Sequence, residues 1–385
     1  MTSRKHLPIV IRVLILIFIL ITTLSCNQKN TENNSSALIH IRLDPNNLPP
    51  LSTLSEIVKS VRIIPLETSP EILVGDVGRS FVGKDHIVFM SRGGTNYLYL
   101  FTKEGKFIRQ IGSKGKGPGE YTRIRGISVL EDEQLIYVLD AFRQPFLGYS
   151  FDGEVAKSFK PPPYEQEMKL IDANTYAATC IVDHEVLIIN TVKNDTLKFI
   201  PLDKDQRSMD PRFSGNQHSG IYYSGIGRDT VYRVSKDGLE PAIAFDFGEG
   251  HVTGDLIIGY PRLPTGVIYI PFGVYNCGDY YHVHIQHHVN VEYPEYHSLF
   301  INKENQELTY MPVFREADDI LFCSSLFFES VSPEGELMTQ VDAIDLIEAL
   351  PKILRNKDFE YTDELINKIK NLNEEDNPVI VLFKL

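Results

Sequence analysis

Residues 97–111, YLYLFTKEGKFIRQI, contain two short β-rich runs joined by a tight turn. Tyr97–Phe101 and Phe107–Ile111 are rich in aromatic and branched apolar residues, and the turn between them contains Gly105. Two such runs around a glycine-containing turn indicate a β-hairpin. This stretch therefore predicts two neighbouring strands of one antiparallel sheet.

The same hairpin pattern recurs along the chain. Its turns lie at Gly105, Gly153, Asp195, Gly238 and Asn305. The first four turns are 42 to 48 residues apart, and the last interval is longer because residues 248–266 form a Gly- and Pro-rich insertion. A sixth, less regular unit covers residues 320–335. A period in the forties with several strands per period is typical of propeller blades.

The chain changes character after residue 340. Apolar residues at 341, 344, 347 and 350 have helical spacing, and Pro351 is expected to end or kink that helix. A second helix is expected over Tyr361–Leu372, and Asn377–Phe383 has the composition of a strand. A terminal strand needs a sheet to join, so we expect it to pair with Val61–Leu66.

These patterns together predict an all-β fold. We expect a six-bladed β-propeller closed by pairing of its N- and C-terminal strands, with a short helical segment near the C-terminus.

The first 25 residues have the features of a secretory signal peptide. Arg4 and Lys5 precede the apolar run Val13–Ile21, which is shorter than the roughly 20 residues that span a bilayer. Ser25 and Cys26 then suggest a lipobox, where signal peptidase II cleaves and Cys26 is acylated. The match is loose, because Thr23 occupies the usual leucine position, and the alternative is an ordinary signal peptide with an incidental Cys26.

The residues after Cys26 favour a lipid anchor followed by a tether. Residues 27–37 are polar and lack aromatic side chains, as a flexible tether does. We therefore expect three segments: a signal peptide over 1–25, a lipidated polar tether and lead-in over 26–56, and the propeller domain over 57–385.

Charge and cysteine content limit the function classes. The formal net charge of the chain is −13, and no basic stripe with interleaved aromatics is present, which disfavours nucleic-acid binding. Cys180, Cys277 and Cys323 remain after Cys26, and this odd number allows at most one disulfide. The alternative is three buried thiols that pack as small apolar groups.

The chain resembles the six-bladed β-propeller lipoproteins of Gram-negative gut anaerobes, which are related to NHL-repeat propellers. Four stretches carry the resemblance: Ile64–Thr68, Phe101–Gly112, Gly115–Tyr121 and Glu374–Leu382. The resemblance covers roughly residues 57–385 and implies the propeller fold and an envelope location, and we expect the lipid anchor to lie in the outer membrane. It brings no catalytic residues, and the single acid in residues 27–32, Glu32, leaves both the periplasmic and the surface face open.

The glycine-rich loop 112–119 is the first candidate site. It lacks the G-x-x-x-x-G-K-[ST] pattern that cradles phosphates, so nucleotide binding is disfavoured. Lys114, Lys116, Glu120 and Tyr121 could meet an anionic or sugar ligand if the loop lies at the mouth of the ring. The alternative is a tight connection between blades in which Glu120 accepts local hydrogen bonds.

His282 and His284 form the second candidate site. On a strand they share one face, and two imidazoles so placed can bind a divalent metal if a third ligand joins them. His297, Glu292 and Asp279 are candidates for that ligand. The alternative is a strand near the rim whose histidines are solvated or hydrogen-bonded to tyrosines, and in that case no cofactor is expected.

The sequence contains no G-x-S-x-G, H-E-x-x-H or EF-hand motif. We therefore expect a non-enzymatic envelope lipoprotein that binds a ligand or partner protein, related to glycans or peptides, through the top face of the propeller. Its other partner is the membrane, through the lipid anchor. The alternative is a hydrolase or lyase with its site in the central channel, possible because propeller enzymes assemble sites from separate blades, and metal-assisted by His282 and His284.

Overall fold

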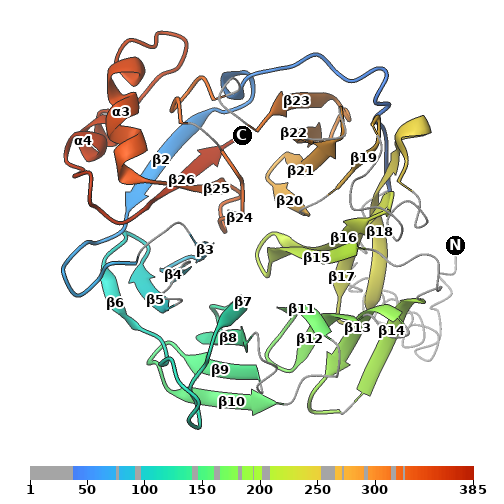
Figure 1. The fold of residues 1–385 in the computed structure, drawn as a ribbon, viewed down its shortest axis with the longest axis vertical. Coiled ribbons are helices and arrows are strands. Elements are labelled where there is room, and N and C mark those ends of the chain that lie inside the picture. The colour runs from blue at the N-terminus through green and yellow to red at the C-terminus, as the bar shows by residue number, and fades with distance from the viewer. Residues whose placement is uncertain are drawn as a thin grey trace, which may run out of the picture. The chain divides into compact units, whose positions relative to one another are not determined.

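The strands follow one another as antiparallel hairpins, and the computed structural model arranges them as six sheets around an axis (Figure 1). This confirms the predicted six-bladed β-propeller. The structure describes residues 38–74, 78–91, 97–140, 146–159, 165–180, 184–193, 195–201, 209–252, 265–270, 273–289, 294–313, 318–323 and 326–385.

Each blade begins with its innermost strand, and we number the blades in chain order. The first three blades are four-stranded sheets: blade 1 with β3 (Arg79–Val82), β4 (His86–Met90), β5 (Leu98–Thr102) and β6 (Phe107–Gln110); blade 2 with β7 (Ile124–Leu130), β8 (Leu135–Asp140), β9 (Phe146–Ser150) and β10 (Val155–Phe159); and blade 3 with β11 (Glu165–Leu170), β12 (Thr175–Cys180), β13 (His184–Asn190) and β14 (Asp195–Pro201).

Of the other three blades, blades 4 and 6 each recruit a strand from the N-terminal segment, and blade 5 is built from consecutive strands. They are blade 4 with β15 (Met209–Asn216), β16 (Gly220–Ile226), β17 (Thr230–Ser235), β18 (Gly238–Asp246) and β1 (Ile39–Arg42); blade 5 with β19 (Ile268–Tyr269), β20 (Val274–Cys277), β21 (Tyr280–His287), β22 (Glu295–Asn302) and β23 (Leu308–Pro312); and blade 6 with β24 (Ser330–Val331), β25 (Leu337–Val341), β26 (Val379–Lys384) and β2 (Ser60–Pro65).

The ring closes in blade 6, where the two ends of the domain pair. Strand β2 is antiparallel to β26, with Val61 opposite Phe383 and Ile64 opposite Ile380. The predicted pairing is therefore confirmed, and it places the C-terminal strand inside a sheet with no free edge of its own.

The predicted hairpin turns all occupy one position in the blade. Gly105, Gly153, Asp195, Gly238 and Asn305 lie at the turns before the fourth strands or at the start of those strands. The sixth unit is less regular, as predicted. There the Asp318 carboxylate accepts hydrogen bonds from the N–H groups of Leu321 (2.8 Å) and Cys323 (2.7 Å), which holds this segment in a turn and not in a strand.

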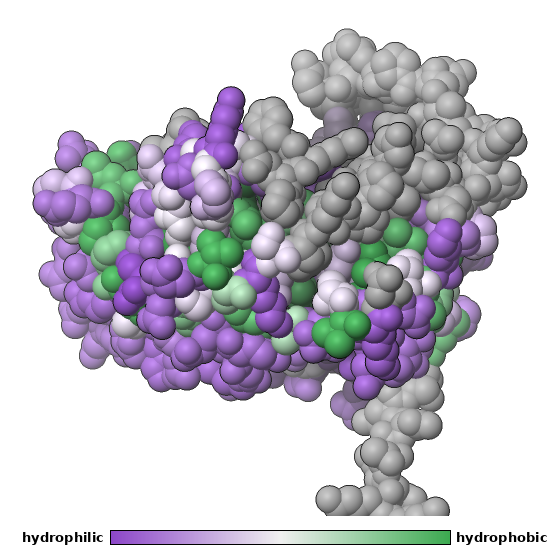
Figure 2. All heavy atoms as spheres, turned by 90° about the horizontal axis from the view of Figure 1, so that it is seen from below, coloured by the Kyte–Doolittle hydropathy of each residue, from purple (hydrophilic) through white to green (hydrophobic). Residues whose placement is uncertain are grey.

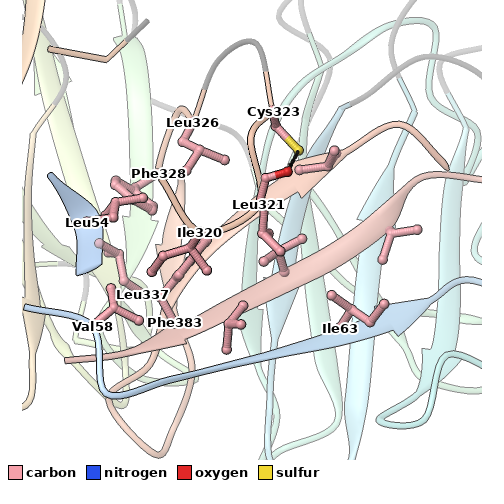
Figure 3. Close-up of a cluster of buried hydrophobic side chains, with 14 of the residues drawn as sticks. Leu54, Val58, Ile63, Ile320, Leu321, Cys323, Leu326, Phe328, Leu337 and Phe383 are labelled. Carbon is pink, nitrogen blue, oxygen red and sulfur yellow. Dashed lines mark hydrogen bonds between the residues drawn. The ribbon is translucent and has the colours of Figure 1, made fainter. Parts of the chain in front are cut away.

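The buried apolar side chains form six large clusters, one at each junction between neighbouring blades. Because side chains alternate across a strand, a strand in the middle of a blade contributes side chains to the clusters on both of its faces. In β26, Val381 and Phe383 face the junction with blade 5, whereas Ile380 and Leu382 face blade 1. Burial on both faces explains why these strands are continuous apolar runs. Figure 3 shows the junction of blades 5 and 6, where Phe328, Leu337 and Phe383 converge.

Two helices cover the outer side of blade 6 (Figure 1). Helix α3 (Ala343–Ile353) contributes Leu346 to the core, and α4 (Asp363–Lys370) contributes Leu365. Pro351 lies inside α3, so the helix continues two residues beyond the proline that was expected to end or kink it. Thr362 caps α4 by accepting a hydrogen bond from the N–H of Leu365 (3.2 Å).

The segment before β2 follows the outer edges of blades 4 and 5. Strand β1 pairs in parallel with β18, and the N–H of Ser52 donates to the carbonyl of Tyr310 in β23 (2.8 Å). A short 3₁₀-helix, η1 (Leu54–Glu56), then leads into blade 6, and another, η2 (Gly248–Gly250), follows β18. The compact unit accordingly starts at Leu38. This segment covers two sheet edges that would otherwise expose unpaired backbone groups.

The surface is mostly polar, with apolar residues in separate groups on the side shown in Figure 2. Within the described ranges, no helix has both the length and the apolar character needed to cross a membrane. Cys277 and Cys323 are free and buried, and burial raises the pKa of both thiols, as the buried-thiol alternative implies. The side chain of Cys180 lies outside the described part.

Candidate functional site

A cavity of about 210 Å³ lies on the propeller axis. The innermost strands of all six blades, or the residues just before them, contribute to its wall. The ring of β3, β7, β11, β15, β20 and β24 around it can be followed in Figure 1. Five charged side chains and one tyrosine face this cavity: Arg79, Glu167, Lys169, Arg212, Glu329 and Tyr275. We call it the axial cavity.

Blades 3 and 4 form one charged wall of the axial cavity. Glu167 and Lys169 are two residues apart on β11, so both point from the same face of the strand, and Arg212 follows on β15. The Glu167 carboxylate accepts a hydrogen bond from the N–H of Phe213 (2.7 Å). Burial raises the pKa of Glu167 and lowers the pKa of Lys169, because each charged form loses water.

Blades 6 and 1 form the opposite wall. Glu329 lies just before β24, and Arg79 is the first residue of β3. Gln340 of β25 joins the two, because its amide donates to Glu329 Oε2 (2.9 Å) and to the carbonyl of Gly78 (3.1 Å). The second wall therefore also carries both signs of charge.

Tyr275 of β20 stands between these walls. Burial is the largest cause of its raised pKa, and the negative charges of Glu329 and Glu167 raise it further, while Arg79 and Arg212 act in the opposite direction. Charges from both walls therefore reach one phenol group. The charged residues surround a common space and do not belong to separate surface patches.

One end of the axial cavity is closed by the turn that follows β15. Asn216 and Gln217 line the cavity, and the Asn216 amide reaches across the axis to donate to the carbonyl of Val331 in blade 6 (2.8 Å). His218 lies with Nε2 3.7 Å from a carboxylate oxygen of Glu131 in blade 2. This turn of blade 4 thus contacts blades 2 and 6 across this end of the cavity, and we expect a ligand to enter from the other end.

Side chains also hold the inner strands to one another. Ser128 of blade 2 accepts a hydrogen bond from the N–H of Leu170 in blade 3 (2.9 Å), and Ser214 of blade 4 donates to the carbonyl of Val274 in blade 5 (2.7 Å). Buried hydrogen bonds of this kind fix the spacing of neighbouring strands. The cavity wall is therefore preorganised.

The structure places His282 and His284 behind the cavity wall, not in it. Their rings lie 4.5 Å apart on β21, and the His282 ring stacks on Tyr275 at 5.9 Å. His284 Nε2 donates to the carbonyl of Phe328 (2.8 Å), and His282 Nε2 shares a hydrogen bond with Ser298 (3.0 Å). Both histidines are buried and neither of these two bonds goes to a tyrosine, but His288 of the same cluster shares a hydrogen bond with the Tyr269 hydroxyl (3.4 Å).

Burial also affects the charge of this pair. It lowers the pKa of His282 and brings that of His284 to about 4, so both rings are neutral at pH 7. Among the described residues, no three His, Cys, Asp or Glu side chains gather in a way that could hold a metal ion. Of the proposed third ligands, His297 stacks on Tyr310 at 4.6 Å, and Glu292 lies outside the described residues.

The glycine-rich loop lies away from the axial cavity. Tyr121 is fully buried and donates to the carbonyl of Ile111 (3.3 Å), while Glu120 accepts from the N–H of Gly117 (2.7 Å). Lys114 and Lys116 are exposed, and none of the four predicted ligand residues lines the cavity. A role of this loop in ligand binding stays a prediction.

The five charged residues of the axial cavity were not identified from the sequence. They come from four blades and form no motif. One signal could have found them: a charged residue within or just before the first strand of a blade repeat, beside apolar neighbours, as in Glu167-Met168-Lys169-Leu170. Because first strands face the axis, a charge there points into the channel.

This chain is similar to solved structures, one of which has a TM-score above 0.5 and supports the fold. A Bacteroides fragilis protein described as exported is 17% identical, with a TM-score of 0.67 over 90% of this chain and 99% of that one. A Bacteroides vulgatus member of the DUF4221 family is 10% identical, with a TM-score of 0.49 over 85% of this chain and 97% of that one. No curated protein sequence matches the chain.

The family assignment rests on a match along the whole described propeller. The family described as a domain of unknown function, DUF4934, matches residues 38–384. That range begins one residue before β1 and ends with the last residue of β26, so it contains all six blades. The chain therefore belongs to the DUF4934 family.

Proposed function

We propose that this chain is a cell-envelope lipoprotein that binds a small, polar ligand in its axial cavity without catalysing a reaction. The ligand is a fragment of peptide or glycan that carries an anionic group. It enters from the face opposite the turn after β15, which is the top face at the N-terminal ends of the inner strands.

One observation carries this proposal: charged side chains from four blades face a single cavity that is closed at one end. Burying charged groups costs free energy unless they are well paired, so a fold alone has no reason to collect them on its axis. A ligand with complementary charges supplies that reason. The cavity is smaller than the roughly 300–1,000 Å³ of pockets that enclose drug-sized molecules, so the ligand is small.

The envelope part of the proposal rests on the sequence before residue 38 and on one neighbour. A basic head and an apolar run precede Cys26, and the Bacteroides fragilis protein of the same fold is described as exported. A lipid on Cys26 would anchor the propeller to the outer membrane. The proposal holds for either face of that membrane.

Calorimetric titration of the purified lipoprotein in detergent tests the binding function. The probes are amino acids, dipeptides, sugar acids and neutral monosaccharides. We expect at least one charged probe to bind, and Arg212→Gln to weaken that binding at least tenfold. Binding that is unaffected by Arg212→Gln, or no binding by any probe, contradicts the proposal.

Two control variants locate the site. Lys193→Gln removes an exposed cation from a groove lined by the turns of blades 2 to 4, outside the axial cavity, and should leave affinity unchanged. Lys116→Gln tests the glycine-rich loop. A loss of affinity in Lys116→Gln, but not in Arg212→Gln, moves the site to that loop.

A second candidate function is a hydrolase or lyase that uses the same cavity. Lys169 favours it, because burial lowers the pKa of this amine and a neutral amine can accept a proton from a substrate. Product formation that Lys169→Gln abolishes would support it. A metal-assisted reaction through His282 and His284 requires metal in elemental analysis of the purified protein and loss of turnover in His284→Ala.

A further inference from the structure

We infer that the ligand of the axial cavity is a sugar acid, a single saccharide unit that carries one carboxylate, several hydroxyl groups and no ammonium group. This inference rests on the proposed binding function and narrows its ligand from peptide and glycan fragments to one class. The balance of charge in the cavity, the placement of its cations and its remaining hydrogen-bonding groups carry it.

The charges of the axial cavity leave an excess of one positive charge. The described residues that line it include three cations and two carboxylates: Arg79, Lys169, Arg212, Glu167 and Glu329. A proton that passed from Lys169 to Glu167 would neutralise both groups and leave the same excess. A ligand with a single negative charge completes the balance, whereas a ligand that also carried an ammonium group would leave the excess in place.

Two of the three cations repel each other. Arg79 and Lys169 form no salt bridge with any described residue. Burial is the largest cause of the lowered pKa of Lys169, and the charge of Arg79 lowers it further, against the effect of Glu167. A Cβ atom at Gly126 would lie 3.9 Å from an Nη atom of Arg79, so the guanidinium reaches β7 of blade 2, between blades 1 and 3. An anion bound there pairs with both cations and relieves their repulsion.

A buried hydroxyl group supports this anion site. Ser128 lies two residues after Gly126 on β7, lines the cavity and accepts a hydrogen bond from the N–H of Leu170 (2.9 Å). Among the described residues, none accepts the hydrogen of the Ser128 hydroxyl. A carboxylate oxygen supplies that acceptor. The planar guanidinium of Arg79 can bind both oxygens of the same carboxylate.

The size of the charge excess distinguishes a carboxylate from a phosphate. A carboxylate of ordinary pKa carries one negative charge at pH 7. A phosphate monoester carries about −1.5 to −2, which is more than the cavity has to offset. A sugar acid therefore matches the cavity better than a sugar phosphate.

The other polar groups of the cavity suit hydroxyl groups. Burial is the largest cause of the raised pKa of Glu167, and the charges of all three cations act against it, so this carboxylate needs no further cation from a ligand. It accepts one hydrogen bond, from the N–H of Phe213 (2.7 Å), and a carboxylate has about four lone-pair sites. The Tyr275 hydroxyl has no hydrogen bond to a described residue and can donate or accept. Saccharide hydroxyls can bind both groups without adding charge.

The size and the apolar part of the wall also suit one saccharide unit. A space of about 210 Å³, closed at one end by the Asn216 turn, has no room for a folded partner or a long polymer. Phe81 and Phe213 line the same space and offer apolar contact to the C–H groups of a sugar ring.

Calorimetric titration of the purified lipoprotein with matched analogues tests the ligand class. The probes are glucuronate and galacturonate, their methyl esters, glucose and galactose, the 6-phosphates of both sugars, and glucosamine. We expect at least one of the two acids to bind. Its methyl ester and its neutral sugar should bind at least tenfold more weakly, and its 6-phosphate should also bind more weakly than the acid.

One variant assigns the carboxylate to the cation pair. Arg79→Gln should reduce the preference for the acid over its methyl ester by at least a factor of three. Arg62→Gln makes the same substitution on the outer strand of blade 6 and should leave that preference intact. If Arg79→Gln fails to fold, which its thermal transition reveals, the comparison of acid, ester and neutral sugar on the native protein still decides.

The failure of this inference differs from the failure of the binding function. The sugar-acid inference is wrong, and the axial binding site stands, if the methyl ester or the neutral sugar binds as tightly as the acid. The same conclusion follows if the 6-phosphate binds more tightly, or if only amino acids and dipeptides bind. If no probe binds at all, both are wrong.

Discussion

The closure seam is the region where the two ends of the domain pair in blade 6 and where blade 6 meets blade 1. The seam and the axial cavity both combine residues far apart in sequence, but they use polar side chains in opposite ways. At the seam, the Asn377 amide oxygen accepts from the N–H of Val74 (3.0 Å), and its nitrogen donates to the carbonyls of Glu67 and Ile72 (both 2.7 Å). Each polar atom of this buried side chain therefore has a backbone partner. Around Asn377 the seam is a saturated network.

The axial cavity is the unsaturated counterpart. The Glu167 carboxylate accepts from the N–H of Phe213 (2.7 Å) and the Glu329 carboxylate from the Gln340 amide (2.9 Å), while Arg79 and Lys169 form no salt bridge with any described residue. Groups that serve only the fold tend to be fully paired, whereas functional groups often cost stability. The difference agrees with the proposed function, in which seam residues stabilise the ring and cavity residues bind a ligand.

The stretches that carry the family resemblance contain fully paired polar groups, like those around Asn377 at the seam. The backbone N–H of Asn377 donates to Thr68 (2.8 Å), the N–H of Glu67 donates to the carbonyl of Gly105 (2.8 Å), and Tyr121 donates to Ile111 (3.3 Å). These hydrogen bonds link the four stretches in pairs around the seam and the first two blades.

The largest expected effect is at the seam. Asn377→Ala leaves one buried N–H and two buried carbonyls without their partner, and each such group costs about 1–3 kcal/mol. We expect the free energy of unfolding to fall by about 4 kcal/mol, measured by urea denaturation. Asn371→Ala, at the exposed end of α4, is the control and should change it by less than about 0.5 kcal/mol. A loss below about 1 kcal/mol in Asn377→Ala would mean that the seam is not saturated in this sense.

The next effect tests the layer behind the cavity wall. The pKa of His284 is about 4 in the native state, against about 6.5 in the unfolded chain. Between these values the unfolded chain binds a proton that the native protein does not, so the free energy of unfolding falls as the pH drops from about 6.5 to about 4. We expect His284→Gln to remove about 3 kcal/mol of this acid-induced loss.

Urea denaturation of both proteins at pH 7 and at pH 4 measures that difference. The exposed His40→Gln is the control and should retain the acid sensitivity of the native protein. His282 and His297 are buried as well and have lowered pKa values, so part of the sensitivity should persist in His284→Gln. An unchanged pH dependence in His284→Gln would show that this layer is open to water.

The fold could be predicted from the sequence because its signals are local and repeated. A turn such as Gly105 fixes a hairpin within a few residues, and the apolar runs of β2 and β26 need no partner to be recognised. The cavity could not be predicted from the sequence, because Arg79, Glu167 and Glu329 become neighbours only when the ring closes. The histidine pair shows the same limit: strand periodicity placed His282 and His284 on one face but not the blade that face would meet.

A smaller effect separates backbone strain from close packing at the seam. Gly105 and Gly153 occupy equivalent turns, with φ of 84° and 87°. A Cβ at Gly105 would lie 2.2 Å from the carbonyl oxygen of Pro65, whereas at Gly153 the nearest atom is 3.6 Å away. Alanine suffers the same left-handed strain at both positions. We expect Gly105→Ala to be less stable than Gly153→Ala by about 1.5 kcal/mol in urea denaturation. An equal loss of unfolding free energy in both variants would mean that the backbone at Pro65 moves to accommodate the added Cβ.

The smallest effect compares one substitution, arginine to glutamine, in the two regions. Arg62 of β2 forms an ion pair with Glu336, with Nε 2.8 Å from Oε1, so Arg62→Gln should lower the free energy of unfolding by about 1 kcal/mol. Arg79→Gln removes an unpaired cation from the cavity and should change the unliganded protein by less than about 0.5 kcal/mol, since the lost charge was not offset by a partner. Thermal and urea denaturation of both variants measure the contrast. A loss in Arg79→Gln as large as in Arg62→Gln would make Arg79 a structural residue, and the distinction between a saturated seam and an unsaturated cavity would not hold.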